Sequence, residues 1–554
     1  MARKPIQLPK TKWANLPKSE TESKAEAKKT IKFAPVQWND VSEEEIKDDG
    51  MPSRKIEVTP SQWDNIEGLS SPSMIRQFDG VNTLDPFSIK DSYATRILNF
   101  TSRAYPALQV RNGTMNLGLD PVFTSSNLIS SAVYSELGWV VTAGTNWYEG
   151  AGLASVTNKS STLSNNKPWE FIRFQGGFAN SNILATNGVD KPKAYDEVTK
   201  GFVDLPNAPD KGQYITLYNN RIFMAKAQTL YYSALRKGDD WTTVNDAGQI
   251  VVETQNGANI SGIAESFGHL MIFKLNSIHE LFGSGPDNFQ LKLLTENVGC
   301  AASRSIQYID GELYFLYRDG IYRYSGGSLP ENDFSLAVRE YTKYQNTYEH
   351  SFSWVNGRKY YLCLTDTLEP SGLYSGKTIL EYDTQLNSWH VWEFPKPLVN
   401  VVPRQGFSNN TDAATLYLIT NDSRMMQWND EAWDFDKDFT QSENPTDIVQ
   451  IPYEWVSKPF TFQSMSSKSR WYRLWITASI PVGANMNIHV SPKENGENWT
   501  LIKTVTPGEN TQSMKIPIPV DVANFENWIR LRIEGKGKVT IHEIAYQDRS
   551  FPMV

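Results

Sequence analysis

The sequence has few of the residues on which metal and redox sites depend. Its 554 residues include only two cysteines, Cys300 and Cys363. A disulfide framework is therefore excluded, and because each cysteine lies in or beside an apolar strand-like run, we expect two buried free thiols. No pair of histidines has the HExxH spacing of a metal site, and CxxC is absent. The six histidines are His269, His279, His350, His390, His489 and His542.

Motifs for nucleophiles and nucleotides are also missing. There is no GxSxG and no GxGxxG. GLYSGKT at 372–378 is one residue short of a P-loop and leads into a strand-like run, where a P-loop needs a helix. Asp434 and Asp436 lie in DFDKDF, which lacks the glycine and terminal glutamate of an EF-hand and is typical of a solvated turn. We expect no catalytic residue, no metal and no cofactor.

Positive charge and long apolar runs are scarce as well. The formal net charge is -8 and no basic stripe is present, which argues against sequence-specific nucleic-acid binding. No run approaches 18 apolar residues, so we expect no membrane span. The N-terminus is basic but no apolar segment follows it, so we expect no signal peptide.

Aromatic residues, by contrast, are abundant. They make up 12% of the chain, with 17 Trp, 25 Tyr and 25 Phe, and Gly and Pro are scattered throughout. This mixture favours pleated, half-buried strands joined by tight turns. The length favours two or three folded units. The sequence therefore predicts an all-β protein.

Residues 1–72 differ in composition from the rest and are rich in Lys, Glu, Ser and Pro. Such a segment cannot bury enough apolar area to fold alone. It contains a threefold repeat: KPIQLPKTKWANL at 4–16, KTIKFAPVQWNDV at 29–41 and RKIEVTPSQWDNI at 54–66. Trp13, Trp38 and Trp63 are spaced 25 residues apart. We predict an extended N-terminal arm with three equivalent segments.

The pattern within each repeat predicts a partner-binding peptide. Two apolar residues separated by one position face the same side of an extended strand. A tryptophan and a final aliphatic residue follow, which favours addition of a strand to a sheet edge with Trp filling a pocket. Twenty-five residues span about 80 Å when extended, so three sockets on neighbouring subunits are within reach and would add avidity. The alternative is a duplicated, disordered linker. The predicted contact residues are Ile6, Leu8, Trp13, Leu16, Ile31, Phe33, Trp38, Val41, Ile56, Val58, Trp63 and Ile66.

From residue 73 to 450, short apolar and aromatic runs alternate with Gly, Asn, Asp and Pro. Several pairs of runs flank a turn dipeptide, such as Asn219-Asn220, Asn276-Ser277 or Asp319-Gly320, and read as β-hairpins. Regular hairpins without helical periodicity favour radial repetition of small sheets. We predict a β-propeller of six to eight blades over 73–450.

Several segments of this region resemble a known family. FDGVNTLDPFSIKDSYATRILNF (78–100), ILATNGVDKPKAYD (183–196), LYYSALRKGDDW (230–241), HLMIFKLNSIHELFG (269–283) and VGCAASRSIQYIDGELYFLYRDGIYRY (298–324) are similar to segments of tailed-bacteriophage β-propeller tail and neck proteins. The resemblance covers residues 75–330 well and the remainder loosely, and the arm departs from it. It implies a nozzle-, hub- or neck-like protein that forms rings, often sixfold.

Residues 451–554 read as a separate unit of short strands and turns. We predict a C-terminal β-sandwich of the galactose-binding-like or jelly-roll kind. Trp471, Trp499 and Trp528 are candidate glycan-stacking platforms. Each lies at a strand end, however, so packing in the core is the alternative that we favour.

These features lead to one main hypothesis and two rivals. The chain is expected to be a non-enzymatic virion protein, assembled in the host bacterial cytoplasm, located in the tail or neck, and forming a homo-oligomer such as a hexamer. Its arm would bind a portal, adaptor or tail-tube ring. The first rival is a receptor-binding tail protein that recognises a host cell-surface glycan. The second is a propeller glycosidase, which would need a carboxylate pair in a pocket on the propeller axis.

Overall fold

Short antiparallel strands account for almost all of the regular structure in this computed structural model, which confirms the expected all-β class. The structure describes residues 29–32, 55–58, 72–116, 123–124, 127–135, 138–152, 155–160, 163–164, 166–180, 183–254, 257–343, 348–402, 415–429, 436–437, 448–461, 467–493, 495–505, 507–508, 511–518 and 528–552. Helix among these residues is limited to α2 (Arg339–Thr342) and short 3-10 turns. The chain divides into two units, Met1–Ser70 and Ser71–Val554, and each is described by itself.

The first unit contains one described pair of strands. Strand β1 (Lys29–Lys32) pairs antiparallel with β2 (Lys55–Val58), and Ile31 lies opposite Ile56 in the register. These strands come from the second and third repeats of the arm.

The second unit contains five small antiparallel sheets, each built from strands that are consecutive in the chain. The first two consist of β8 (Ile129–Ser135), β9 (Gly138–Ala143), β10 (Asn146–Gly152) and β11 (Ser155–Ser160), and of β12 (Glu170–Arg173), β13 (Ile183–Thr186), β14 (Lys193–Asp196) and β15 (Gly201–Asp204). The third and fourth consist of β16 (Tyr214–Tyr218), β17 (Arg221–Lys226), β18 (Thr229–Tyr232) and β19 (Gly248–Val251), and of β20 (Ile260–Ser266), β21 (His269–Lys274), β22 (Ile278–Phe282) and β23 (Gln290–Thr295). The fifth consists of β24 (Gln307–Ile309), β25 (Glu312–Tyr317) and β26 (Gly320–Tyr324).

A ten-stranded sheet follows, and its longest strand is shared between two halves. The first part of β31 (Ser388–Val402) pairs with β30, whereas its last residues pair with β32. Strand β7 (Thr114–Asn116), from the N-terminal side of the unit, lies between β33 (Met425–Asn429) and β34 (Asp436–Lys437) and pairs with both. The other strands are β27 (Phe352–Asn356), β28 (Lys359–Leu364), β29 (Thr367–Leu368), β30 (Tyr374–Asp383), β32 (Thr415–Thr420) and β35 (Ile448–Val449).

Local turn chemistry explains the tight hairpins. Asn219 and Asn220, between β16 and β17, both have positive φ, 48° and 57°. Asp310 and Gly311, between β24 and β25, have φ of 52° and 86°. Two consecutive left-handed residues form the turn whose twist matches that of paired strands, and Asn, Asp and Gly tolerate that conformation best.

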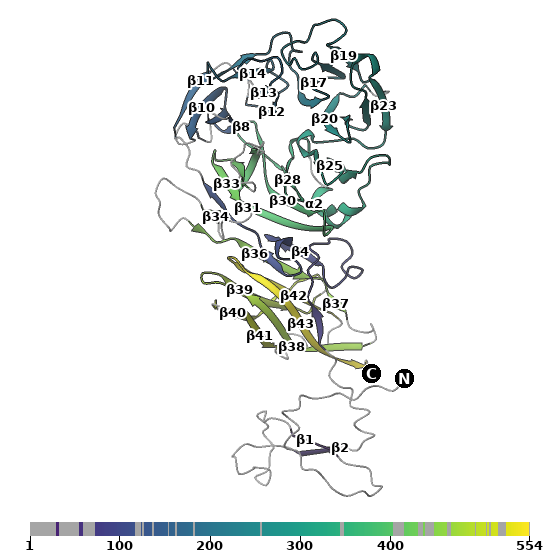
Figure 1. Ribbon diagram of the computed structural model, residues 1–554. Coiled ribbons are helices and arrows are strands. Elements are labelled where there is room, and N and C mark those ends of the chain that lie inside the picture. The colour runs from purple at the N-terminus through teal and green to yellow at the C-terminus, as the bar shows by residue number, and fades with distance from the viewer. Residues whose placement is uncertain are drawn as a thin grey trace. The chain divides into compact units, whose positions relative to one another are not determined.

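The small sheets follow one another around a common centre (Figure 1). Strands of successive sheets contact each other: β12 contacts β16, β16 contacts β20, β24 contacts β27, and β31 contacts β8. Within the ten-stranded sheet, β27 also contacts β31. The backbone N–H of Trp169 donates to Ser131 Oγ at 2.7 Å, which links the segment before β12 to β8. Separate apolar clusters lie between neighbouring sheets, so each sheet buries both of its faces. We call this arrangement the sheet ring.

The remaining strands form two six-stranded sheets. One contains β3 (Ser73–Ile75), β5 (Phe100–Thr101), β6 (Leu108–Val110), β38 (Ser467–Ser479), β41 (Gln512–Pro517) and β43 (Thr540–Pro552). The other contains β4 (Ala94–Leu98), β36 (Pro452–Ser457), β37 (Phe460–Thr461), β39 (Asn485–Ser491), β40 (Thr500–Val505) and β42 (Trp528–Lys536). The arm was expected to end at residue 72, close to the observed division after Ser70. Residues 73–110, which were expected in the propeller, instead pair with strands of 451–554.

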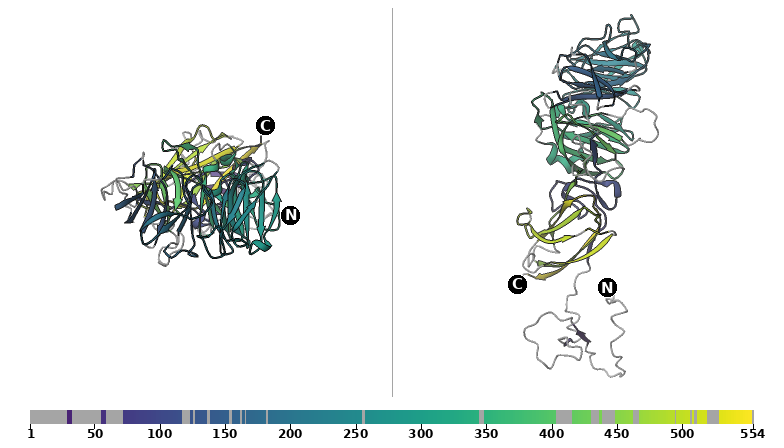
Figure 2. Two further views of the ribbon diagram at one scale, coloured as in Figure 1. Left: turned by 90° about the horizontal axis from the view of Figure 1, so that it is seen from above. Right: turned by 90° about the vertical axis from the view of Figure 1, so that its left-hand side faces the viewer.

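One apolar core joins the two six-stranded sheets to each other and to the sheet ring. It contains Ile97 and Ile533 from one sheet, Ile476 from the other, and Tyr360 and Tyr382 from β28 and β30 of the ring. Strand β31 contacts β4 and β5, and both figures place the two sheets next to this part of the ring (Figures 1 and 2). The shared core explains why residues after Ser70 form a single unit.

Candidate functional site

Only part of the predicted arm site lies among the described residues. Ile31 belongs to β1, and Ile56 and Val58 belong to β2, so these positions have the extended conformation that the repeat predicts. The two strands pair with each other. The other predicted contact residues lie outside the described part of the chain: Ile6, Leu8, Trp13, Leu16, Phe33, Trp38, Val41, Trp63 and Ile66.

The three candidate stacking tryptophans have different surroundings. Trp471 is fully buried and stacks on Tyr546, with 4.8 Å between the ring centroids. The stacking role is therefore wrong for Trp471, because its ring is part of the core. Trp528 is half-buried, with its ring 6.1 Å from that of Phe87. Trp499 is half-buried and lines a cavity.

This cavity, of about 690 Å³, lies on the face of the sheet that contains β4, β36, β39 and β42. Alternation along the strands builds it, because successive side chains point to opposite faces. In β36, Trp455 belongs to the core while its neighbour Glu454 lines the cavity. In β42, Leu531 and Ile533 belong to the core while Arg532 lines the cavity. We call it the face cavity.

A row of alternating charges crosses the sheet beneath the face cavity. Arg96 Nε lies 2.9 Å from Glu454 Oε2, and the other oxygen of Glu454 lies 2.7 Å from Arg532 Nε. Arg532 also forms an ion pair with Glu534, whose second oxygen lies 3.0 Å from His489 Nε2. Burial lowers the pKa of His489, and the Glu534 carboxylate opposes that shift. The row presents cationic donors and carboxylate acceptors in turn.

The turn before β40 positions Trp499 at the edge of the face cavity. Gly496 has a φ of 74°, and a Cβ atom there would lie 3.1 Å from Trp499 Cζ2. The turn is closed by hydrogen bonds from Gly496 N–H to the Lys493 carbonyl, 3.1 Å, and from Lys493 N–H to Ser491 Oγ, 3.1 Å. The guanidinium carbon of Arg532 lies 5.9 Å from the centroid of the Trp499 ring, within range of a cation–π contact.

Two smaller cavities lie at the centre of the sheet ring. Their volumes are about 280 and 600 Å³, and they share Ile263, Ile306 and Gln307 as lining residues. Cavities of this size hold small molecules or water.

Polar side chains from separate strands meet in the smaller central cavity. Arg304 donates to Asn400 Oδ1 and to the His350 carbonyl, each at 3.0 Å. Ser303 Oγ donates to Glu170 Oε1 at 3.4 Å. Burial raises the pKa of Glu170 to about 7, although Arg304 and the hydrogen bonds to the carboxylate lower it. This carboxyl therefore titrates near neutral pH, but the structure places no second carboxylate beside it in the lining of this cavity.

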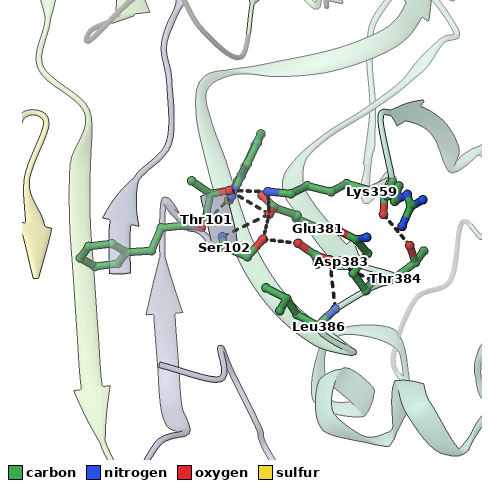
Figure 3. A network of polar contacts seen from close by, with 11 residues as sticks. Thr101, Ser102, Lys359, Glu381, Asp383, Thr384 and Leu386 are labelled. Atoms are coloured by element: carbon green, nitrogen blue, oxygen red, sulfur yellow. Dashed lines mark hydrogen bonds and ion pairs between the residues drawn. The ribbon is translucent and has the colours of Figure 1, made fainter. Parts of the chain in front are cut away.

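A buried polar network joins the sheet ring to the segment after β5 (Figure 3). Lys359 Nζ lies 2.8 Å from Glu381 Oε1, and Thr101 Oγ1 donates to the same oxygen at 2.8 Å. Ser102 Oγ donates to Asp383 Oδ2 at 2.6 Å. Glu381 and Asp383 are both buried, so substrate cannot reach them. The network fixes the segment after β5 against β30.

The two cysteines and Asp436 are buried. Burial raises the pKa of Cys300 to about 12, and it also raises the pKa of Cys363. Both thiols are free and buried, as expected, and thiols with raised pKa are poor nucleophiles. Asp436 does not face solvent, because its carboxylate binds the buried Arg111. Among the described residues, no group of three or more His, Cys, Asp or Glu side chains is arranged to hold a metal ion.

No family model and no curated protein matches the sequence. Among solved structures, the extracellular domain of a hybrid two-component system from B. thetaiotaomicron is 8% identical with a TM-score of 0.36, and the match covers 65% of this chain and 42% of that one. The CNH domain of AfRom2 is 10% identical with a TM-score of 0.37, covering 58% of this chain and 100% of that domain. A related extracellular domain from B. thetaiotaomicron is 11% identical with a TM-score of 0.37, covering 80% and 62%. At these TM-scores the likenesses carry no argument about function.

Sequence reasoning missed most of the face cavity. Of its lining residues it singled out only Trp499. Its charged residues come from three strands that are far apart in the sequence, β4 (Arg96), β36 (Glu454) and β42 (Arg532 and Glu534). Isolated charges in strands give no local signal of a shared site.

In the described ranges no helix is long and apolar enough to cross a membrane.

Proposed function

We propose that this chain is a structural, non-enzymatic component of a tailed-phage virion, located at the tail nozzle, hub or neck. It forms a homo-oligomeric ring and attaches to a portal, adaptor or tail-tube ring through its arm. The observation that carries the proposal is the threefold repeat with tryptophans 25 residues apart. The extended strands β1 and β2, from equivalent positions of two repeats, support a role for these segments in strand pairing.

We further propose that the sheet ring is a seven-bladed β-propeller. The five small sheets are five blades, and the halves of the ten-stranded sheet on either side of β31 are two more. Strand β7 would close the circle by completing the last blade. The two six-stranded sheets would form a β-sandwich, because their inner faces share one core. Propellers present short, protected edges, which suits side-by-side packing in a ring.

The role that follows is mechanical. The cavities at the centre of the sheet ring have volumes of about 280 and 600 Å³, which is the size of small-molecule sites. A DNA path would be bounded by several copies arranged around it. The arm would then link each copy to its neighbours, and three linked segments bind more tightly than one because of their effective concentration.

The test replaces Trp13, Trp38 and Trp63 with alanine in phage that carry the full chain. We expect the virion to lose this protein or to assemble without a closed ring, as seen by cryo-electron microscopy. A matched control with Glu22→Ala, Glu45→Ala and Lys47→Ala, all in the spacers between repeats, should assemble normally. A protein that remains monomeric in the particle, or seats normally without the three tryptophans, would contradict the proposal.

A further inference from the structure

We infer that the face cavity is a saccharide-binding site, with Trp499 as its aromatic wall and the Arg96–Glu454–Arg532–Glu534 row as its polar floor. The inference does not depend on the arm or on assembly into a ring. It rests on the size of the cavity, on the charged groups of its floor, and on the pairing of β36 and β42 on both sides, which leaves no strand edge for a peptide.

The cavity has the size and construction of a preformed ligand site. Its volume of about 690 Å³ is within the range of small-molecule sites. A second cavity of about 430 Å³ shares Thr95, Arg96 and Arg530 with it and adds Leu84 and Tyr341 to the lining. Because the two cavities share these lining residues, they are neighbours, and neighbouring cavities suit a chain of several sugar units better than a single one.

The floor of the cavity matches ligands that donate and accept hydrogen bonds at closely spaced positions. Arginine side chains only donate and ionised glutamates only accept. In the row, the Glu454 carboxylate lies between the guanidinium groups of Arg96 and Arg532. A sugar hydroxyl can donate to a carboxylate and accept from a guanidinium at once. Neighbouring hydroxyls on one ring can therefore satisfy both kinds of group.

Other ligand classes fit this floor less well. The lining holds four cationic side chains beside the carboxylates of Glu454 and Glu534, so it suits a ligand that meets both kinds of charge. An apolar ligand would leave the charges desolvated. An extended peptide binds by adding to an unpaired sheet edge. The cavity instead lies over β36 and β42, and each of these strands is already paired on both sides. The observations therefore favour a saccharide over a peptide.

Trp499 supplies the apolar surface that a sugar ring needs. Its ring is half-buried, and the left-handed turn at Gly496 holds it beside the cavity. The cation–π contact with Arg532 fixes the ring relative to the polar floor. The apolar C–H face of a pyranose can pack on such a ring while its hydroxyls reach the row of charges.

The test measures binding of the purified full chain to an array of oligosaccharides built from hexoses, hexosamines and uronic acids, followed by calorimetric titration of any saccharide that binds. Trp499→Ala and Glu454→Gln should each weaken binding roughly tenfold or more, and Trp499→Phe should retain part of it. Lys503→Ala is the control, because Lys503 is exposed on β40 and does not line the cavity. Unchanged unfolding temperatures would show that the variants are folded.

Three outcomes would overturn the inference: no saccharide binding up to millimolar concentrations, binding that Trp499→Ala leaves unchanged, or binding that Lys503→Ala weakens as much as Trp499→Ala. None of these outcomes bears on assembly of the ring, which is tested through the arm. Failure of the saccharide site and failure of the proposed function are thus distinguishable.

Discussion

Arg111 is fully buried, and its guanidinium joins groups from several distant segments. It lies 2.7 Å from Asp436, donates to Asn99 Oδ1 at 3.0 Å and to the Glu393 carbonyl at 3.2 Å, and is 4.3 Å from the ring centroid of Phe394. A buried ion pair with this many hydrogen bonds compensates the desolvation of both charges. Removing one partner leaves the other buried and unpaired.

We therefore expect Arg111→Met to lower the free energy of unfolding by about 3–5 kcal/mol. Arg76→Met is the matched control, because Arg76 pairs with Glu543 at 3.1 Å with its side chain 66% exposed. Exposed pairs contribute less than about 1 kcal/mol. Urea unfolding followed by tryptophan fluorescence measures both variants. Equal losses in the two would show that the buried pair has no special role.

His390 is buried opposite Glu381 in the pairing of β30 and β31. Burial lowers its pKa from 6.5 to about 4. Between these values the unfolded chain binds more protons than the folded chain, so stability rises with pH. The contribution is fully present above pH 6.5 and is lost as the pH falls towards 4.

His390→Phe removes this titration while keeping an aromatic ring in the core. We expect the variant to lose less stability than the unsubstituted protein between pH 6.5 and 4. The measurement is the urea midpoint at several pH values across that window. A change in packing would shift all midpoints by a similar amount, so the slope is the relevant readout. Parallel pH profiles for the two proteins would argue against a neutral, buried His390.

At the scale of elements, the junction between Gly80 and β31 is unusually close. Val81 N–H donates to the Trp389 carbonyl at 2.8 Å, and a Cβ atom on Gly80 would lie 2.2 Å from that oxygen. Gly80 also has a φ of 88°, a conformation that favours glycine. Both facts require a residue without a side chain at this position.

Gly80→Ala should therefore separate the segment before β4 from β31. We expect a loss of about 2–4 kcal/mol, since the change combines backbone strain with a clash against backbone rather than against a flexible side chain. Gly357→Ala tests strain alone: its φ is 58°, and no atom lies within 4 Å of the added Cβ. Thermal unfolding of both variants separates the two terms. If Gly80→Ala lowered the free energy of unfolding no more than Gly357→Ala, β31 would have moved to make room for the added methyl group.

The hairpins were the most predictable elements. Asn219-Asn220 signals a turn locally, and the structure places that turn between β16 and β17. GLYSGKT was correctly rejected as a P-loop, because its residues 374–378 belong to strand β30 and no helix follows them in the described part of the chain. The two partner strands of β31 were not foreseen, although Pro395 and Pro397 lie where its pairing changes from β30 to β32. Proline cannot donate to a strand ladder, so this pair is the local signal that was missed.

At the scale of the whole molecule, amino-acid composition distinguishes the arm from the rest of the chain. The arm contains long charged spacers, whereas the later residues contain frequent apolar strand-like runs. The assignment of residues 73–110 could not be made in this way. Their short strands resemble those of the sheet ring, yet β4 pairs with β36, more than 350 residues later. Such pairing depends on side-chain fit across the sheet, and a single sequence carries no direct signal for it. The residues of the charged floor of the face cavity are also far apart in the sequence, so no local pattern predicts that they meet.

The last prediction concerns the independence of the two units. The arm and the residues after Ser70 separate as distinct units, and the second unit has an apolar core built from its own described residues. A chain lacking residues 1–70 should therefore unfold within about 2 °C of the full chain, because surface segments outside a core contribute little to its stability. By the proposed function, the same truncation should abolish incorporation into virions.

Differential scanning calorimetry and cryo-electron microscopy of particles made with the truncated chain test the two halves of this prediction. Loss of incorporation with an unchanged unfolding temperature would assign attachment to the arm alone. A fall of 10 °C or more would show that the arm stabilises the second unit, and lost incorporation would then reflect misfolding. Normal incorporation without the arm would leave attachment to the sheet ring and the two six-stranded sheets, and would remove the main support for the anchoring role of the repeats.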